Sequence, residues 1–180
     1  MTRDRATLHL HIDRLQPDDR DAFAWLGILH RDALVRASTA ATLWEGSEAG
    51  ARRRLQRSAE AALVQPAGDE EGYRLDKEAR EAASQLQAQR MSLAESHARL
   101  LERYRAQVQD GLWHTLPGDG YVHEHLTWHM EDAGWEGELH ALLKEENPEG
   151  RNGWFEMRKK LVARRPLPGL HPDLLDLFRG

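Results

Sequence analysis

Apolar residues recur at three- and four-residue spacing through most of this chain, and turn residues interrupt the pattern at short intervals. Such spacing places the apolar side chains on one face of a helix. Between residues 92 and 109 the apolar positions step by four, three, three and four, at Ala94, Ala98, Leu101, Tyr104 and Val108. Because glycine and proline end each run early, the pattern predicts a set of short helices that pack against one another.

The composition narrows the class of protein further. The chain has 180 residues, of which 40% are hydrophobic and 31% charged, and it contains no cysteine. Disulfides, thiolate nucleophiles and cysteine zinc sites are therefore excluded. No apolar run approaches the roughly 20 residues that span a bilayer, and the charged N-terminus does not resemble a secretory signal. We expect a cytoplasmic protein of one or two small domains that does not contact a membrane.

Residues 1–76 are predicted to form a winged-helix domain, which has three helices and a β-hairpin. Pro17 suits the first position of a helix, and two aspartates follow it near the positive end of the helix dipole. The turn-rich stretch 66–71 separates two short apolar runs, as in a hairpin loop. The predicted helices cover residues 17–29, 37–45 and 47–61, and the predicted strands cover 62–65 and 72–75.

Residues 77–180 are predicted to form an α-helical bundle, so the fold as a whole is mainly α. Short loops between the helices favour antiparallel neighbours. Asp119 or Gly120 is placed to cap the helix that follows the loop at 111–120. The predicted helices cover residues 78–89, 92–109, 122–133, 136–145 and 154–162, with a further short apolar segment at 174–178.

No motif for an enzyme is found in the sequence. It lacks a P-loop, a dinucleotide-binding glycine pattern and a nucleophile elbow. In the histidine-rich run at 123–129, the residue four positions after His123 is Thr127, so the zinc-protease pattern fails. His125 and His129 do share a helix face and form the alternative metal site, with help from Glu131 or His114. The preferred interpretation is that these histidines pack on or beside the core, with no metal, no cofactor and no catalytic residue.

Three stretches of the chain are similar to STAND signal-transduction NTPases of the apoptosome (NB-ARC) type, whose bacterial members often end in WD-repeat propellers. The run Leu116–Leu143 resembles the helical segment of that family, with an aspartate-glycine-tyrosine, a His-Leu-Thr-Trp-His stretch and a leucine-rich helix. Asn152–Arg158 and Leu174–Arg179 resemble the segments on its C-terminal side in bacterial members. The order of Arg14-Leu15, Leu43-Trp44 and Tyr73–Leu75 resembles the winged helix that precedes it.

The resemblance implies a role without catalysis. In that family the winged helix packs on the nucleotide-binding domain and helps to lock the resting state, and a histidine after the last wing strand touches the phosphate of ADP. The matching residues here are Leu75, Asp76 and Lys77, so Asp76 occupies the nucleotide-sensor position, where a carboxylate would repel phosphate. The chain is then either a fragment of a larger protein, beginning near a domain boundary at Met1, or a module that has lost the nucleotide link.

The first functional hypothesis is therefore a scaffold or coupling module. It would transmit conformational change between an NTPase domain and a sensor or effector region, in cis or in trans, through protein–protein contacts. Arg53, Arg57 and Trp135 are the candidate partner contacts. Of the tryptophans at 113, 128, 135 and 154, most are expected to fill crevices between helices, and Trp135 is expected to be the most exposed because it follows Gly134.

Three alternatives belong to other classes of protein. A DNA-binding winged-helix regulator would use the helix that carries Arg52–Arg57, but the net charge over residues 1–65 is only +1 and these arginines can pair with Glu48 or Glu60. That charge balance argues against nucleic acid. A metal-dependent enzyme would use His125 and His129, and an adaptor would need no NTPase at all. The sequence leaves the oligomeric state open.

Overall fold

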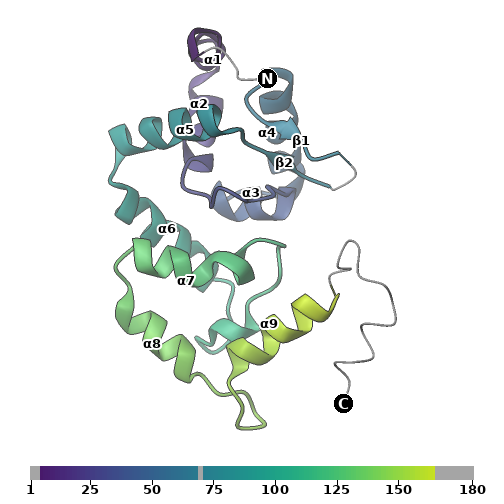
Figure 1. The fold of residues 1–180 in the computed structure, drawn as a ribbon, viewed down its shortest axis with the longest axis vertical. Coiled ribbons are helices and arrows are strands. Elements are labelled where there is room, and N and C mark those ends of the chain that lie inside the picture. Colours follow the sequence, from purple (N-terminus) through teal and green to yellow (C-terminus); the bar gives the residue numbers. More distant parts are fainter. Residues whose placement is uncertain (1–4, 69–70, 165–180) are drawn as a thin grey trace.

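The computed structural model describes residues 5–68 and 71–164, and it is mainly helical, as predicted (Figure 1). No helix in these two ranges is both long and apolar enough to cross a membrane. The predicted segment at 174–178 lies outside the described residues. The elements are α1 (Arg5–Asp13), α2 (Pro17–Leu26), α3 (Ala37–Leu43), α4 (Glu48–Glu60), β1 (Gln65–Pro66), β2 (Tyr73–Arg74), α5 (Lys77–Arg90), α6 (Leu93–Arg105), the 3-10 helix η1 (Trp113–Thr115), α7 (Val122–Asp132), α8 (Glu136–Lys144) and α9 (Gly153–Arg164).

The helix α1 was not predicted. It buries Leu8 and Ile12, which lie four residues apart, and it packs against α5. One i,i+4 pair among polar residues is too short a pattern to indicate a helix by periodicity alone. The helix is therefore held by its tertiary contacts.

The hairpin is present but shorter than predicted. β1 and β2 pair antiparallel, with Gln65 opposite Arg74 and Pro66 opposite Tyr73. Val35 adds a bridge on the other side of β2, because it exchanges main-chain hydrogen bonds of 2.8 and 3.0 Å with Tyr73. The segment before α3 thus lies beside the hairpin at Val35.

The helices α2 and α5 approach closely at a glycine. A Cβ atom on Gly27 would lie 2.2 Å from the main-chain nitrogen of Ser84. Because that neighbour is backbone of α5, it cannot move aside, and only glycine fits at this position. The helix α5, which the prediction placed in the helical bundle, therefore packs closely on α2.

The buried face of α6 differs from the predicted one. Ser96, His97 and Leu100 are buried together with Leu101 and Tyr104, whereas Ala94 is exposed. The helix also ends at Arg105 instead of near residue 109. Leu101 and Tyr104 are buried as predicted, but the buried face also includes polar residues, which a pattern of apolar residues does not indicate.

One continuous cluster of buried side chains runs from Leu8 in α1 to Trp154 in α9. In Figure 1 the elements α1–α5 with the hairpin form one half and α6–α9 form the other, and α3 lies along the side that faces α6 and α7. We call the first the N-terminal half, the second the C-terminal half and their contact surface the junction. The junction positions the candidate site.

Candidate functional site

Asp119, just before α7, ties the C-terminal half to α3. Its carboxylate accepts the main-chain N–H of Tyr121 and Val122 at 2.8 and 2.9 Å, and the Tyr104 hydroxyl at 2.6 Å. Its main-chain oxygen accepts the hydroxyls of Ser38 and Thr39 at 3.2 and 3.3 Å. The first contacts hold the main chain at the start of α7, although the N-cap residue of that helix is Tyr121 and not the predicted Asp119 or Gly120. Asp119 thus anchors the start of α7 to the N-terminal half.

Gly120 and Arg36 complete this contact. The glycine has a φ of +81°, a left-handed conformation, and a Cβ atom there would lie 1.8 Å from the Arg36 guanidinium. Both facts favour glycine at this position. The guanidinium donates to the Gly120 oxygen at 3.4 Å.

Arg103 joins α6 to the N-terminal half from the same side. Its guanidinium donates to the main-chain oxygen of Leu43, at the end of α3, and pairs with Glu45 at 2.9 Å. It also lies 4.3 Å from the ring centre of Trp25, a cation–π contact. Burial lowers the pKa of Arg103 from its usual value, while Glu45 opposes that effect. The side chain thus holds three N-terminal segments at once.

A second group of side chains fills the other side of the junction, and we call it the histidine cluster. The ring of His30, which follows α2, stacks on His125 at 4.5 Å between centres and meets Trp128 edge-on at 5.1 Å. His97 contacts both Trp128 and His129. The cluster consists of His30, His97, Tyr121, His125, Trp128 and His129.

Hydrogen bonds run through this cluster. The Tyr121 hydroxyl accepts the main-chain N–H of His30 at 2.9 Å and lies 2.7 Å from Nε2 of His129. Nδ1 of His129 lies 2.6 Å from Nδ1 of His97, and Nε2 of His97 lies 3.7 Å from the Asp132 carboxylate. A connected path therefore leads from the N-terminal half to a half-exposed carboxylate on α7.

Burial shifts the pKa values in this cluster toward the neutral forms. The pKa of His129 is well below its usual value, first because of desolvation and then because His97, His125 and His30 lie nearby. Desolvation also lowers the pKa of His97 and of His125, although Asp132 opposes the shift at His97. Burial raises the pKa of Tyr121 far above its usual value. At neutral pH these imidazoles are therefore uncharged.

Arg80 of α5 fixes the loop that carries His30. Its guanidinium donates to the main-chain oxygens of Leu29, His30 and Arg31 at 3.1, 3.0 and 2.8 Å, and to that of Leu75 at 3.3 Å. Burial lowers the pKa of Arg80, with Tyr121 and nearby carboxylates opposing that effect. The main-chain oxygens that follow the end of α2 thereby have hydrogen-bond donors, although no helix supplies them.

The two histidines of the alternative metal pair have other partners in this arrangement. Both ring nitrogens of His129 are engaged by Tyr121 and His97, and His125 stacks between His30 and Tyr121. His114, one of the proposed helpers, instead bonds to the Glu145 carboxylate. Across the described part of the chain, no three histidine or acidic residues are grouped to hold a metal ion.

Asp76, at the position of the expected nucleotide sensor, has a local structural contact. It is the N-cap of α5, and its carboxylate accepts the main-chain N–H of Ala79 at 2.8 Å. It also accepts from the Gln65 amide of β1 at 3.4 Å. The side chain thus joins the hairpin to the start of α5.

The arginines of α4 are paired, but with other partners than predicted. Arg57 makes two hydrogen bonds to Asp19 at 2.7 and 3.0 Å, Arg54 lies 3.3 Å from the same carboxylate, and Arg52 bonds to Glu71 at 2.7 Å. The predicted partners Glu48 and Glu60 lie on α4 itself, whereas Asp19 and Glu71 come from α2 and the hairpin loop. Arg53 is exposed and bonds to none of the described residues.

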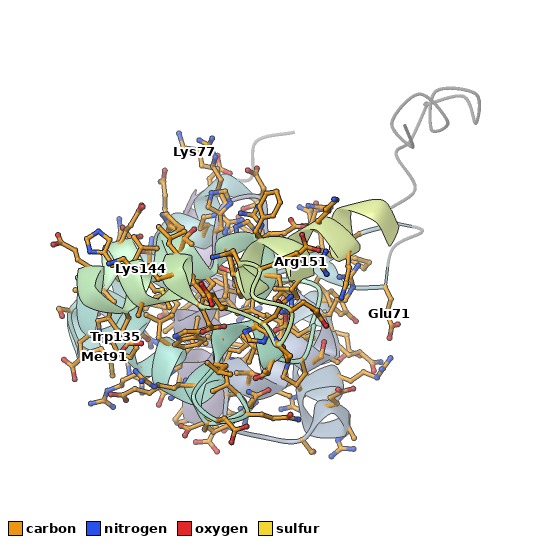
Figure 2. All side chains as sticks on the ribbon, turned by 90° about the horizontal axis from the view of Figure 1, so that it is seen from below. Glu71, Lys77, Met91, Trp135, Lys144 and Arg151 are labelled. Atoms are coloured by element: carbon orange, nitrogen blue, oxygen red, sulfur yellow. The ribbon has the colours of Figure 1, made fainter. Side chains whose placement is uncertain are left out.

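The tryptophans of the C-terminal half mostly fill crevices, as preferred. Trp113 and Trp154 are buried, and Trp128 is half-buried within the histidine cluster. Trp135 is also half-buried and packs at the edge of the core. In Figure 2 it lies at the periphery of the molecule, on the side opposite Glu71. The exposed apolar side chains of this half are instead Leu93, Leu143 and Phe155.

Two cavities flank the junction. One, of about 480 Å³, lies between α3, α6 and the loop before α7, and Arg103 and Asp119 line it. The other, of about 580 Å³, lies beside the histidine cluster, where His97, Trp128 and Asp132 line it. The junction is thus accessible to solvent from both sides.

Comparison with known families gives one match. Residues 93–147 match the family model of the APAF-1 helical domain. No curated protein matches the chain. The matched range covers α6, η1, α7 and α8, so it contains the whole C-terminal side of the junction, including Arg103, Asp119 and His129. The stretch Leu116–Leu143, on which the resemblance was based, lies entirely within it.

Proposed function

We propose that this chain is a coupling or scaffold module of a STAND-type signalling protein that has no catalytic activity of its own. It would transmit conformational change between an NTPase domain and a sensor or effector region, in cis or in trans. The observation that carries the proposal is the match of residues 93–147 to the APAF-1 helical domain. A cytoplasmic location is part of it, and the cysteine-free composition is compatible with that location.

The proposal treats the N-terminal half as a winged helix. The order of α2, α3 and α4 followed by the β1–β2 hairpin supports this interpretation, and the bridge between Val35 and Tyr73 supplies the third extended segment beside the hairpin. In a STAND protein such a domain would precede the matched helical segment, as it does here.

The junction gives the proposal a physical mechanism. Rigid-body movement of one domain against another is a common form of signal transmission. Here the two halves share one apolar core and are joined by a few polar groups, chiefly Arg103, Asp119 and Tyr121, and cavities adjoin both sides. A partner that pulls on either half would act on these contacts.

The DNA-binding alternative has less support. Among the described residues, Asp19 and Glu71 pair with three of the arginines on α4, which leaves Arg53 as the unpaired cation on that face for phosphate contact. Such a surface contributes little of the counterion release that drives DNA affinity. Fluorescence anisotropy with a labelled duplex at low salt tests this alternative directly, and we expect no binding.

The test of the coupling proposal uses the NTPase domain encoded in the same or the neighbouring reading frame. We expect a stable complex with this chain by size-exclusion chromatography with light scattering. Substitutions at the candidate contacts, Trp135→Ala and Arg53→Glu, should weaken it, whereas Lys144→Ala, at the other end of α8 from Trp135, should not. Because Arg53 is exposed, Arg53→Glu should do so at unchanged melting temperature. Absence of an encoded NTPase domain, or of a complex, would contradict the proposal.

A nucleotide control separates coupling from catalysis. The chain by itself should neither hydrolyse ATP nor change its mass in light scattering when ATP is added. An ATP-dependent change in the isolated chain would assign the nucleotide response to this module and overturn the proposed division of roles.

A further inference from the structure

The hydrogen bonds of the histidine cluster have a definite direction. The Tyr121 hydroxyl already accepts the His30 N–H, and its single proton has one acceptor among the described residues, Nε2 of His129. That nitrogen is therefore unprotonated, and neutral His129 carries its proton on Nδ1. Nδ1–H then donates to Nδ1 of His97 at 2.6 Å.

The tautomer of the second imidazole depends on the first. Because Nδ1 of His97 accepts a hydrogen bond from Nδ1–H of His129, neutral His97 carries its own proton on Nε2. That N–H faces the Asp132 carboxylate at 3.7 Å, which favours the same tautomer. The path from the His30 amide to Asp132 is thus a series of contacts, and each contact joins one donor to one acceptor.

One additional proton disrupts this series of hydrogen bonds, whether it binds to His97 or to His129. A proton on Nδ1 of His97 places two N–H groups against each other across the 2.6 Å contact. A proton on Nε2 of His129 removes the acceptor of the Tyr121 hydroxyl, which is buried. Either change leaves a donor unpaired and adds a charge among buried side chains, and both effects are costly there.

The charges around the cluster do not compensate for an added proton. Asp132 is the carboxylate at the end of the chain, but its side chain is 43% exposed and hence well screened. Asp119 is engaged by Tyr104 and by main-chain amides. The groups that face the cluster from the surrounding elements are His30, Asp32, Arg80, Glu81, Tyr104, Asp119, Glu124, Asp132 and Arg158.

We propose that the histidine cluster makes one side of the junction proton-sensitive: it joins the two halves there while His97 and His129 are both neutral, and this side of the junction opens when either takes up a second proton. The hydrogen bond that breaks is the one between the Tyr121 hydroxyl and the His30 amide. Of the hydrogen bonds in the histidine cluster described above, it is the one that crosses from one half to the other. The proposal concerns the junction alone and does not require the partner domain proposed above.

Hydrogen exchange of one amide measures the opening directly. The His30 N–H is protected by Tyr121 across the junction, whereas the Val35 N–H is protected by Tyr73 within the N-terminal half. Lowering the pH from 7 to 5.5 should reduce the protection factor of His30 by about tenfold, which corresponds to one pKa unit of linkage, and should leave that of Val35 unchanged. Equal loss at both amides would indicate unfolding instead, and no loss at His30 would overturn the proposal.

Nitrogen chemical shifts of the imidazoles test the direction of these hydrogen bonds. At pH 7.5 His129 should show a protonated Nδ1 and His97 a protonated Nε2. The reverse pair of tautomers would contradict the argument independently of any variant.

A variant identifies the responsible histidine. His97→Gln removes the titrating group, so the pH dependence of His30 protection should be reduced at least severalfold. The control His140→Gln changes an exposed histidine on α8 and should retain the full pH dependence. The same pH dependence in both variants would exclude His97, and the wild-type comparison of His30 with Val35 remains decisive if His97→Gln does not fold.

Discussion

The two sides of the junction are held by different chemistry. On one side, Arg103 and Asp119 carry full charges that bond to main-chain oxygens, amides and a tyrosine. On the other side, His97, Tyr121 and His129 are neutral and each fills a donor or acceptor role in one chain. In the second set, burial lowers the pKa of His97 and of His129 from the ordinary imidazole value of about 6.5, so these two groups respond to mild acid. One interface thus combines a permanent attachment with an adjustable one.

This contrast explains how such an interface can respond without coming apart. If both sides were ionised, the contact would be insensitive to mild acid, and if both were imidazole chains, it would be lost entirely. With one of each, loosening the histidine side leaves α7 attached through Asp119 and Arg103. Substitutions on each side, measured at two pH values, separate the two contributions.

Asp119→Ala should give the largest effect. It removes the acceptor of the Tyr104 hydroxyl, which is buried, and the acceptor of two amides at the start of α7. The loss of an acceptor for two amides together with an unpaired buried hydroxyl is expected to lower the free energy of unfolding by about 3 kcal/mol. Urea denaturation at pH 7 and pH 5.5 measures it, and the loss should be the same at both values. The conservative Asp119→Asn should recover about half of it, since the amide keeps one oxygen.

Arg103→Ala should follow, with a loss of about 2 kcal/mol from its cation–π contact and its bonds to Leu43 and Glu45. Arg99, one turn earlier on the same helix, pairs with Glu95 on the exposed surface, so Arg99→Ala is the matched control and should cost under about 0.5 kcal/mol. Equal effects of the two substitutions would show that this side of the junction is no stronger than an ordinary surface pair.

Much of the helical framework can be predicted from the sequence, because its signals are local. Pro17 starts α2, Ser47 and Ser92 cap α4 and α6, and the Asp119 carboxylate accepts a main-chain amide at the start of α7. Each needs only neighbouring residues to identify it. The missed helix α1 and the close contact at Gly27 depend on α5, which is more than 50 residues away from both, and no local pattern indicates them.

The candidate site shows the same limit. The sequence singled out His125 and His129 as an i,i+4 pair and preferred core packing for them. It contained no signal that His30 and His97 would join them, because those residues lie on other elements. The predicted partners of the α4 arginines were wrong for the same reason. Helix spacing suggested Glu48 and Glu60, while the fold supplies Asp19 and Glu71. Contacts between distant elements decide both outcomes.

The histidine side should make stability depend on pH in a narrow window. The folded-state pKa of His129 lies below the unfolded value of 6.5, so below pH 6.5 the unfolded chain binds more protons and the free energy of unfolding falls. The expected slope is about 1.4 kcal/mol per pH unit for each such histidine. The Asp19 carboxylate has a lowered pKa, so its contribution is lost only below about pH 3.8.

The window from pH 6.5 to 4.5 therefore isolates the histidines. Urea denaturation series across it measure the slope. Tyr121→Phe should lower stability by about 1 to 2 kcal/mol at pH 7, because the His30 amide and Nε2 of His129 lose their partner. A flat profile in the wild type would place the junction's stability wholly on the Arg103 side.

Away from the junction, charge pairs should contribute least, and Arg57 gives the reference value. Its two bonds to Asp19 are well formed, but the guanidinium is 51% exposed, so Arg57→Ala should cost less than about 1 kcal/mol. Arg53→Ala, on the same helix, should change stability by no more than about 0.5 kcal/mol in either direction. Salt distinguishes the two further, since about 1 M NaCl should reduce the Arg57 effect and leave the Arg53 effect unchanged. If Arg57→Ala instead matched Arg103→Ala, location at the junction would not be what makes an arginine contact strong, and the contrast between junction and surface would fail.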